Sequence, residues 1–155
     1  MHYKRKGMNV LKASEYLLDL ANTEGGFDIT NMKLQKLLYY LQGTSLALHN
    51  KRIFEESIIK WQYGPVVPEA YHYYKSSGSQ LLTPPTNVNW ASLNEEEIRL
   101  FNEVFNFFGQ FSAIKLMEMT HNESPWINTE MSNEIGDEIL KEYFETIIIK
   151  DSGEK

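Results

Sequence analysis

The residues best suited to chemistry are His121 and Glu123, which stand two positions apart in the stretch T-H-N-E-S-P-W. An imidazole and a carboxylate at this spacing could transfer protons, or could hold a metal ion if the fold supplied a third ligand. The same pair could instead order its own loop through hydrogen bonds. His2, His49 and His72 are distant from it, and none of them forms an H-E-x-x-H pattern. We therefore predict no catalytic residue and no metal ligand, and we keep an enzyme that uses His121 and Glu123 as an alternative.

Other catalytic motifs are missing from the sequence. It has no cysteine, which excludes disulfides, cysteine zinc sites, iron–sulfur clusters and thiol catalysis. It contains no G-x-S-x-G, no G-x-x-x-x-G-K and no G-x-G-x-x-G. We therefore predict no cofactor and no enzymatic activity. The lack of cysteine also agrees with a reducing cytoplasm, and no apolar run reaches the length of a membrane span.

The charge is negative overall and unevenly distributed. The net charge is -6, which argues against general binding to nucleic acid because such binding depends on neutralising phosphates. Residues 1–90 carry 10 basic and 7 acidic side chains, whereas residues 91–155 carry 5 basic and 14 acidic ones. The acidic half could be a solvated helix surface, or it could steer a basic partner.

Four cations could form a modest basic patch: Lys33, Lys36, Arg52 and Lys60. Two tyrosines that follow Lys36 could stack on bases beside such a patch. In a chain with this net charge, a solvated helix face is the more common arrangement of such residues. We therefore expect no direct binding to nucleic acid.

Hydrophobic periodicity predicts a mainly α fold with one short β element. Leucines at helical spacing predict the longest helix over residues 31–49, with Thr30 as its N-cap. Alternation over residues 58–63 predicts a short strand, for which residues 52–54 could be the hairpin partner. The other expected helices span roughly residues 8–21, 68–77, 95–108, 113–120 and 137–144.

These elements predict a compact single-domain helical bundle with a β-hairpin or strand near residues 52–63. We expect the domain to occupy residues 8–149, between a flexible N-terminal arm (residues 1–7) and a frayed tail (residues 150–155). Gly43 lies inside the longest helix at an intrinsic cost of about 1 kcal/mol relative to alanine. A close crossing by another backbone would explain this glycine, and so would flexibility.

The stretch W-Q-Y-G-P-V-V-P over residues 61–68 is unusual. Two prolines stiffen the connection that follows the predicted strand, and a tryptophan and a tyrosine lie beside it. This stretch could be core packing around a tight turn. It could also be a rigid, aromatic-lined edge that binds another protein chain. Tryptophan and tyrosine dominate interface hot spots, and a rigid surface loses less conformational entropy on binding.

Three motifs in this order carry a family resemblance: L-Q-K-L-L-Y-Y at residues 34–40, W-x-Y-G-P-V-V-P at residues 61–68, and T-H-x-x-x-P-W at residues 120–126. Together they resemble the Panacea domain, the family of SocA-like antitoxins and phage-associated GepA-like proteins. The resemblance extends over about residues 8–145.

The resemblance implies a largely helical domain without enzymatic activity. It implies an antitoxin that neutralises its cognate toxin by direct protein contact, with the toxin encoded by the adjacent gene, and it implies an association with phages or prophages. A phage-encoded regulator or a proteolytic adaptor that binds a host protein is the alternative. A homodimer is also compatible with the aromatic content.

The resemblance also supplies candidate site residues. The candidates for partner binding are Gln35, Lys36, Tyr39, Tyr63, Gly64, Pro65, Val66 and His121. The candidates for scaffold roles are Trp61, Pro125 and Trp126. Within the first group, we expect Gln35, Lys36 and His121 to line a shared surface cleft.

Overall fold

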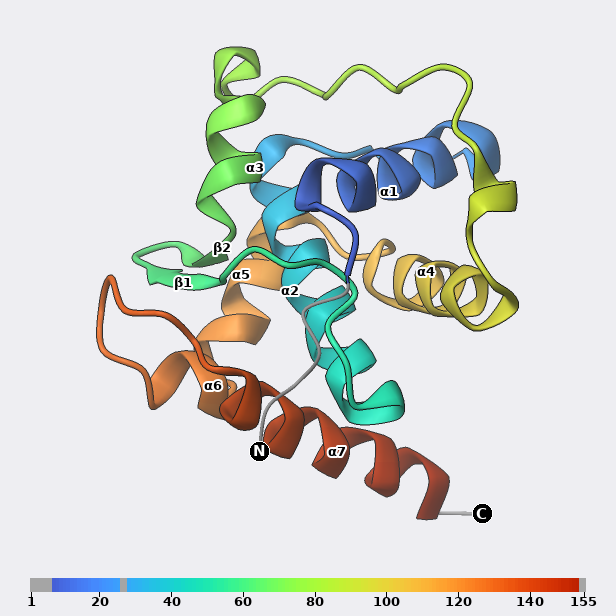
Figure 1. The fold of residues 1–155 in the computed structure, drawn as a ribbon. Helices are drawn as coiled ribbons and strands as arrows, with labels where there is room; N and C mark the ends of the chain where they lie inside the picture. Colours follow the sequence, from blue (N-terminus) through green and yellow to red (C-terminus); the bar gives the residue numbers. More distant parts are fainter. Residues whose placement is uncertain (1–6, 26–27, 154–155) are drawn as a thin grey trace.

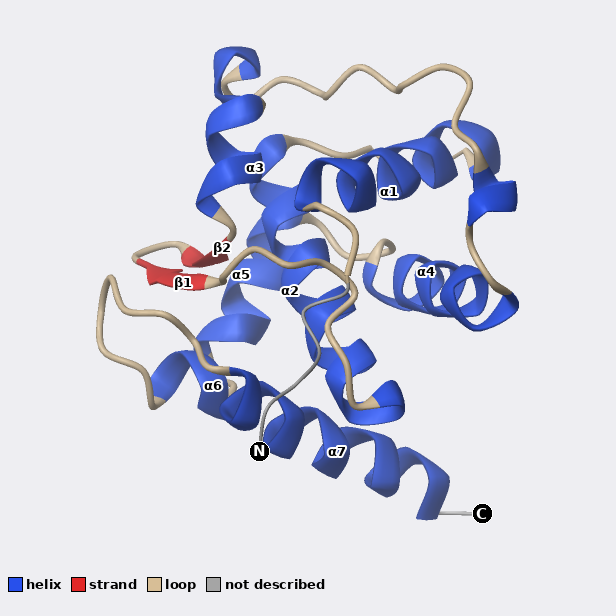
Figure 2. Cartoon of the chain, viewed as in Figure 1, coloured by secondary structure: helices blue, strands red, loops and turns tan. Residues whose placement is uncertain are grey.

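The computed structural model describes residues 7–25 and 28–153, and a long helix, α2, runs through their centre (Figure 1). Helices dominate the described residues, as predicted (Figure 2). The elements are α1 (Val10–Glu24), α2 (Asn31–His49), β1 (Ile59–Trp61), β2 (Gly64–Val66), α3 (Pro68–Tyr73), the 3₁₀ turns Lys75–Ser77 and Trp90–Ser92, α4 (Glu95–Phe108), α5 (Ala113–His121), α6 (Ser124–Ile127) and α7 (Asp137–Gly153).

Local sequence signals account for the helix ends. The side chain of Thr30 accepts a hydrogen bond from the backbone amide of Lys33, and α2 ends at Asn50 in a left-handed conformation. Asn94 and Glu97 form a capping box at the start of α4. These caps satisfy backbone groups that the first and last turns of a helix leave unpaired. The predicted limits of α2 are confirmed.

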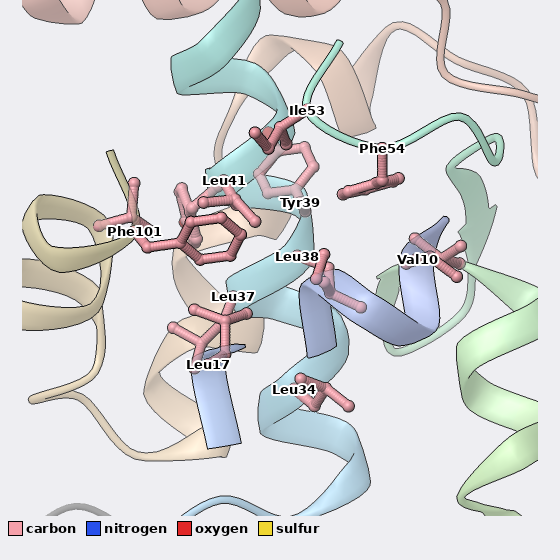
Figure 3. Close-up of a cluster of buried hydrophobic side chains, with 14 of the residues drawn as sticks. Val10, Leu17, Leu34, Leu37, Leu38, Tyr39, Leu41, Ile53, Phe54 and Phe101 are labelled. Carbon is pink, nitrogen blue, oxygen red and sulfur yellow. The ribbon is translucent and has the colours of Figure 1, made fainter. Parts of the chain in front are cut away.

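The core surrounds α2 on all sides. Of its 19 residues, 14 are buried, and side chains from α1, α4 and the segment before β1 pack against its leucines (Figure 3). Gly43 allows a close contact with α7, because a Cβ there would overlap the aromatic ring of Phe144. A side chain, rather than a crossing backbone, therefore explains the glycine inside α2.

The β element differs from the prediction in its pairing. β1 pairs antiparallel with β2, with Ile59 opposite Val66 and Trp61 opposite Gly64. Residues 52–54 are not its partner, and Phe54 instead forms a parallel bridge with Met8. Gly64 permits the tight hairpin because its φ of +114° is a conformation that other residues rarely adopt.

The other edge of β1 is also paired. The backbone amide of Lys60 donates to the carbonyl of Asn133 over 3.0 Å, and the amide of Ser132 donates to the carbonyl of Lys60 over 2.8 Å. The connection between α6 and α7 therefore lies beside the hairpin, on the left in Figure 1.

The C-terminal part is more helical than predicted. Residues 121–126, which lie outside the expected helices, contain the end of α5 and most of α6. Helix α7 continues to Gly153, so residues 150–153 of the expected tail are helical. The rest of that tail and residues 1–6 of the expected N-terminal arm lie outside the described residues. Among the helices that are described, none combines the length and apolar composition needed to cross a membrane.

Candidate partner-binding face

Gln35 ties the hairpin to the central helix. Its side-chain oxygen accepts a hydrogen bond from the backbone amide of Val67 over 2.8 Å, and its nitrogen donates to the side chain of Asn31 over 2.9 Å. Asn31 in turn donates to the carbonyl of Tyr71 on α3 over 3.0 Å. Gln35 is only 1% exposed, so its polar atoms form hydrogen bonds inside the domain.

Lys36 is buried beneath the same hairpin. Its exposed fraction is 1%, and its ammonium group donates to the carbonyl of Pro65 over 3.4 Å. A Cβ on Gly64 would overlap the Cε of this lysine. Burial lowers the pKa of Lys36 to about 7 because the charged form loses its hydration.

The other three cations of the predicted basic patch are buried as well, and each has an internal partner. Lys33 donates to the carbonyl of Gly109 over 2.6 Å, and Lys60 donates to that of Thr129 over 2.9 Å. Arg52 pairs with the carboxylate of Asp137 over 2.9 Å. These residues therefore form neither a basic surface patch nor a solvated helix face.

Glu123 is the centre of a buried cluster of tyrosines. The hydroxyls of Tyr39 and Tyr40 each donate to one carboxylate oxygen over 2.8 Å, and Tyr143 on α7 donates a further hydrogen bond to this carboxylate. Burial raises the pKa of Glu123 to about 7, because the loss of hydration outweighs the three hydrogen bonds that favour its charged form.

Trp126 contacts both the hairpin and the side chain of His121. Its indole nitrogen donates to the carbonyl of Trp61 over 3.1 Å. The His121 ring stacks on it at a centroid distance of 4.2 Å, and the ammonium of Lys60 lies 3.9 Å from its ring centroid. Trp126 therefore joins α5, α6 and β1 into one local unit.

The expected cleft of Gln35, Lys36 and His121 is not formed. Gln35 and Lys36 are buried under the hairpin, whereas His121 stacks on Trp126. The polar groups of Gln35 and Lys36 make internal hydrogen bonds to backbone groups, which buried backbone requires. Tyr39, Gly64, Pro65 and Val66 are buried too, so most of the candidates for partner binding do not face solvent.

The structure also describes the surroundings of His121 and Glu123, the pair considered for proton transfer or metal binding. Both oxygens of Glu123 accept hydrogen bonds from tyrosines, and Nε2 of His121 is buried without a hydrogen-bond partner in the structure. Within the described part of the chain, no group of three His, Cys, Asp or Glu residues is arranged to hold a metal ion.

Exposed aromatic and apolar side chains lie at the end of the molecule that carries the hairpin. Tyr63 at the hairpin turn is 59% exposed, and Ile127 and Met131 are 53% and 51% exposed. Trp61 and Trp126, which are joined by a hydrogen bond, are half-buried. We call these five residues the hairpin face. Ile127 and Met131 could not be predicted from the sequence, because an isolated apolar residue outside a periodic segment carries no signal of its exposure.

Exposed apolar side chains also surround the N-terminal end of α2, where Met32, Leu81 and Ile114 are 37%, 56% and 62% exposed. A hollow of about 320 Å³ lies there against Leu81 and Phe111. None of its lining residues belongs to the three sequence motifs. The hairpin face is therefore the better candidate for a site that the motifs build.

The fold and this site define a small helical domain whose central helix holds an aromatic hairpin through buried polar contacts. Residues 34–127 match the family described as antitoxin SocA-like, Panacea domain. Since the match covers more than half of the chain, the protein belongs to the SocA-like Panacea family, which confirms the resemblance. No curated protein and no solved structure matches the chain.

Proposed function

We propose that the protein is the antitoxin of a toxin–antitoxin system and neutralises its cognate toxin by direct, stoichiometric binding. Its membership of the SocA-like antitoxin family carries this proposal. The toxin is the product of the adjacent gene, the system is borne by a phage or prophage, and the antitoxin acts in the cytoplasm without catalysing a reaction.

The hairpin face is the contact surface in this proposal. Tyr63 offers an exposed aromatic ring at a tight turn, and aromatic rings are frequent hot spots of protein interfaces. Lys36 donates a buried hydrogen bond to Pro65 of β2, and Gln35 accepts one from Val67, which directly follows β2. A surface that is already rigid loses little conformational entropy when a partner binds.

Co-expression with the product of the adjacent reading frame tests the proposal. We expect that product to stop growth alone and to be harmless in the presence of this protein. Protection should rise in proportion to the amount of antitoxin, and the two chains should co-purify in a fixed ratio.

The alternatives give different results in the same experiment. An enzyme would protect at substoichiometric amounts, and its His121→Ala variant would lose protection while it still bound the toxin. If the neighbouring product is harmless alone, the antitoxin proposal is wrong and a regulator or proteolytic adaptor that binds a host protein replaces it.

A further inference from the structure

Lys36 lies beneath the hairpin with fewer hydrogen bonds than its ammonium group can make. The group carries three N–H donors. Within the described residues it has one acceptor, the carbonyl of Pro65 at 3.4 Å, which is longer than the typical distance of about 2.7–3.2 Å. Because Lys36 is only 1% exposed, its other donors are shielded from water. A positive charge in this site is therefore costly.

No opposite charge compensates Lys36. Strand β2 and helices α3 and α5 pack against α2 around it. The buried or half-buried titratable side chains on these and adjoining segments are Lys33, Tyr39 and Tyr40 on α2, Lys60 on β1, Tyr71 on α3, His121 on α5, and Glu123. In the part of the chain that the structure describes, none of them forms a hydrogen bond or an ion pair with Lys36.

The hairpin above Lys36 is a smaller unit than the helix that carries this lysine. Strands β1 and β2 have three residues each, and a short two-stranded hairpin is marginally stable by itself. Gly64 lies directly against the lysine, because a Cβ there would overlap Cε of Lys36. Helix α2, in contrast, has 14 of its 19 residues buried. A local opening of the hairpin is therefore the smallest movement that would hydrate the ammonium group.

We propose that the charge of Lys36 regulates the hairpin face. The charged ammonium favours a hairpin that is lifted from α2, and the neutral amine favours the closed hairpin, which binds the toxin. Tyr63 directly precedes Gly64, so lifting the hairpin displaces the exposed ring of this face. The effect on binding rests on the proposed function, whereas the opening of the hairpin is a property of the free protein.

The direction of the pH effect follows from the two states. In the closed state, burial lowers the pKa of Lys36 from the ordinary 10.5 to about 7, and hydration in the open state restores it toward the ordinary value. Between these values the open state binds more protons, so a rise in pH favours the closed state. The equilibrium constant for opening should fall by at most about tenfold per pH unit above about pH 7, and it should be constant below.

Amide hydrogen exchange of the free protein tests the opening of the hairpin. The reporter is the amide of Val67, which donates to the side chain of Gln35 on α2 over 2.8 Å and loses this partner when the hairpin lifts. The reference is the amide of Leu82, which donates to the carbonyl of Ile29 over 2.9 Å. The measurement is the protection factor of each amide, its exchange rate relative to an unstructured peptide, from about pH 6 to about pH 9.

We expect the protection of Val67 to rise with pH above about 7, whereas that of Leu82 rises less. Lys36→Met removes the charge and keeps the length of the side chain, so in this variant the protection of Val67 should be higher at pH 7 and independent of pH. Lys115→Met, at an exposed position on α5, is the matched control and should behave as the wild type. Circular dichroism melting verifies folding, and Lys36→Gln replaces the Met variant if that variant does not fold.

Two results of the exchange experiment overturn the inference. If the protection of Val67 does not change with pH, or changes equally in Lys36→Met, the charge of Lys36 does not control the hairpin. If Val67 and Leu82 change by the same factor in the wild type, Lys36 acts on global unfolding and not on the hairpin.

Binding to the purified product of the adjacent reading frame tests the effect on the hairpin face. The wild type should bind more tightly at about pH 9 than at about pH 7, and Lys36→Met should show a smaller change over the same range. Equal changes in the two proteins would overturn the regulation of binding. The exchange experiment uses the free protein, so its outcome is independent of whether the neighbouring product is a toxin.

Discussion

The hydroxyl of Tyr39 donates a hydrogen bond to Oε1 of Glu123 over 2.8 Å, although 84 positions separate the two residues in the chain. The adjacent Tyr40 donates to the other carboxylate oxygen. Glu123 immediately precedes α6, which carries Trp126 of the hairpin face. These hydrogen bonds therefore fix the position of α6 relative to the central helix.

Glu123 should make stability depend on pH. Burial raises its pKa from the ordinary 4.5 to about 7, so between these values the folded state binds more protons than the unfolded state. The free energy of unfolding contributed by this group should then fall as pH rises from about 4.5 to 7, by at most about 1.4 kcal/mol per pH unit. Urea unfolding at several pH values measures it.

Glu123→Gln provides the comparison that isolates this group, because other carboxyl groups also titrate in the range. The difference in stability between the wild type and the Gln variant should decline through the window and become constant above about pH 7. A difference that is independent of pH would show that the carboxyl group titrates normally.

Gln35→Ala should destabilise the protein because it leaves the buried amide of Val67 without its partner. The expected loss is about 1–3 kcal/mol of the free energy of unfolding. Gln62→Ala is the matched control, since Gln62 is exposed at the hairpin turn and should change stability by at most about 0.5 kcal/mol. Equal effects of the two substitutions in urea unfolding would contradict the scaffold role of Gln35.

Gly43→Ala should destabilise the domain through its overlap with the ring of Phe144. Overfilling a packed site of this kind costs about 1–3 kcal/mol. Phe144→Leu removes the ring, so the double variant should be less destabilised than the sum of the two single variants. Thermal unfolding of all four proteins measures this coupling, and strict additivity would mean that flexibility, rather than the ring, explains the glycine.

Tyr63→Ala should weaken toxin binding without a loss of stability, because Tyr63 is exposed on the hairpin face. Hot-spot tyrosines contribute about 2 kcal/mol or more, which corresponds to at least about a thirtyfold rise in Kd. Tyr73→Ala is the control, since Tyr73 on α3 is 64% exposed and lies outside the hairpin face. Calorimetric titration with the toxin should separate the two variants, and equal affinities would remove Tyr63 from the interface.

Much of the fold could be predicted because its signals are local. Thr30 was recognisable as a helix cap, since a cap acts on amides two or three residues away. The β-hairpin was misassigned, because residues 52–54 and 64–66 both adjoin the strand and periodicity does not distinguish between partners.

The sequence by itself determined the family, the mainly helical class and the limits of α2. Only the tertiary structure decided which polar residues face solvent. Gln35 finds its partner 32 positions away, and Tyr39 finds its partner 84 positions away. A polar side chain is stable either in water or in a buried site where it has a hydrogen-bond partner. The spacing of residues along one helix does not show which of these two environments a polar residue occupies, when distant segments cover every side of that helix.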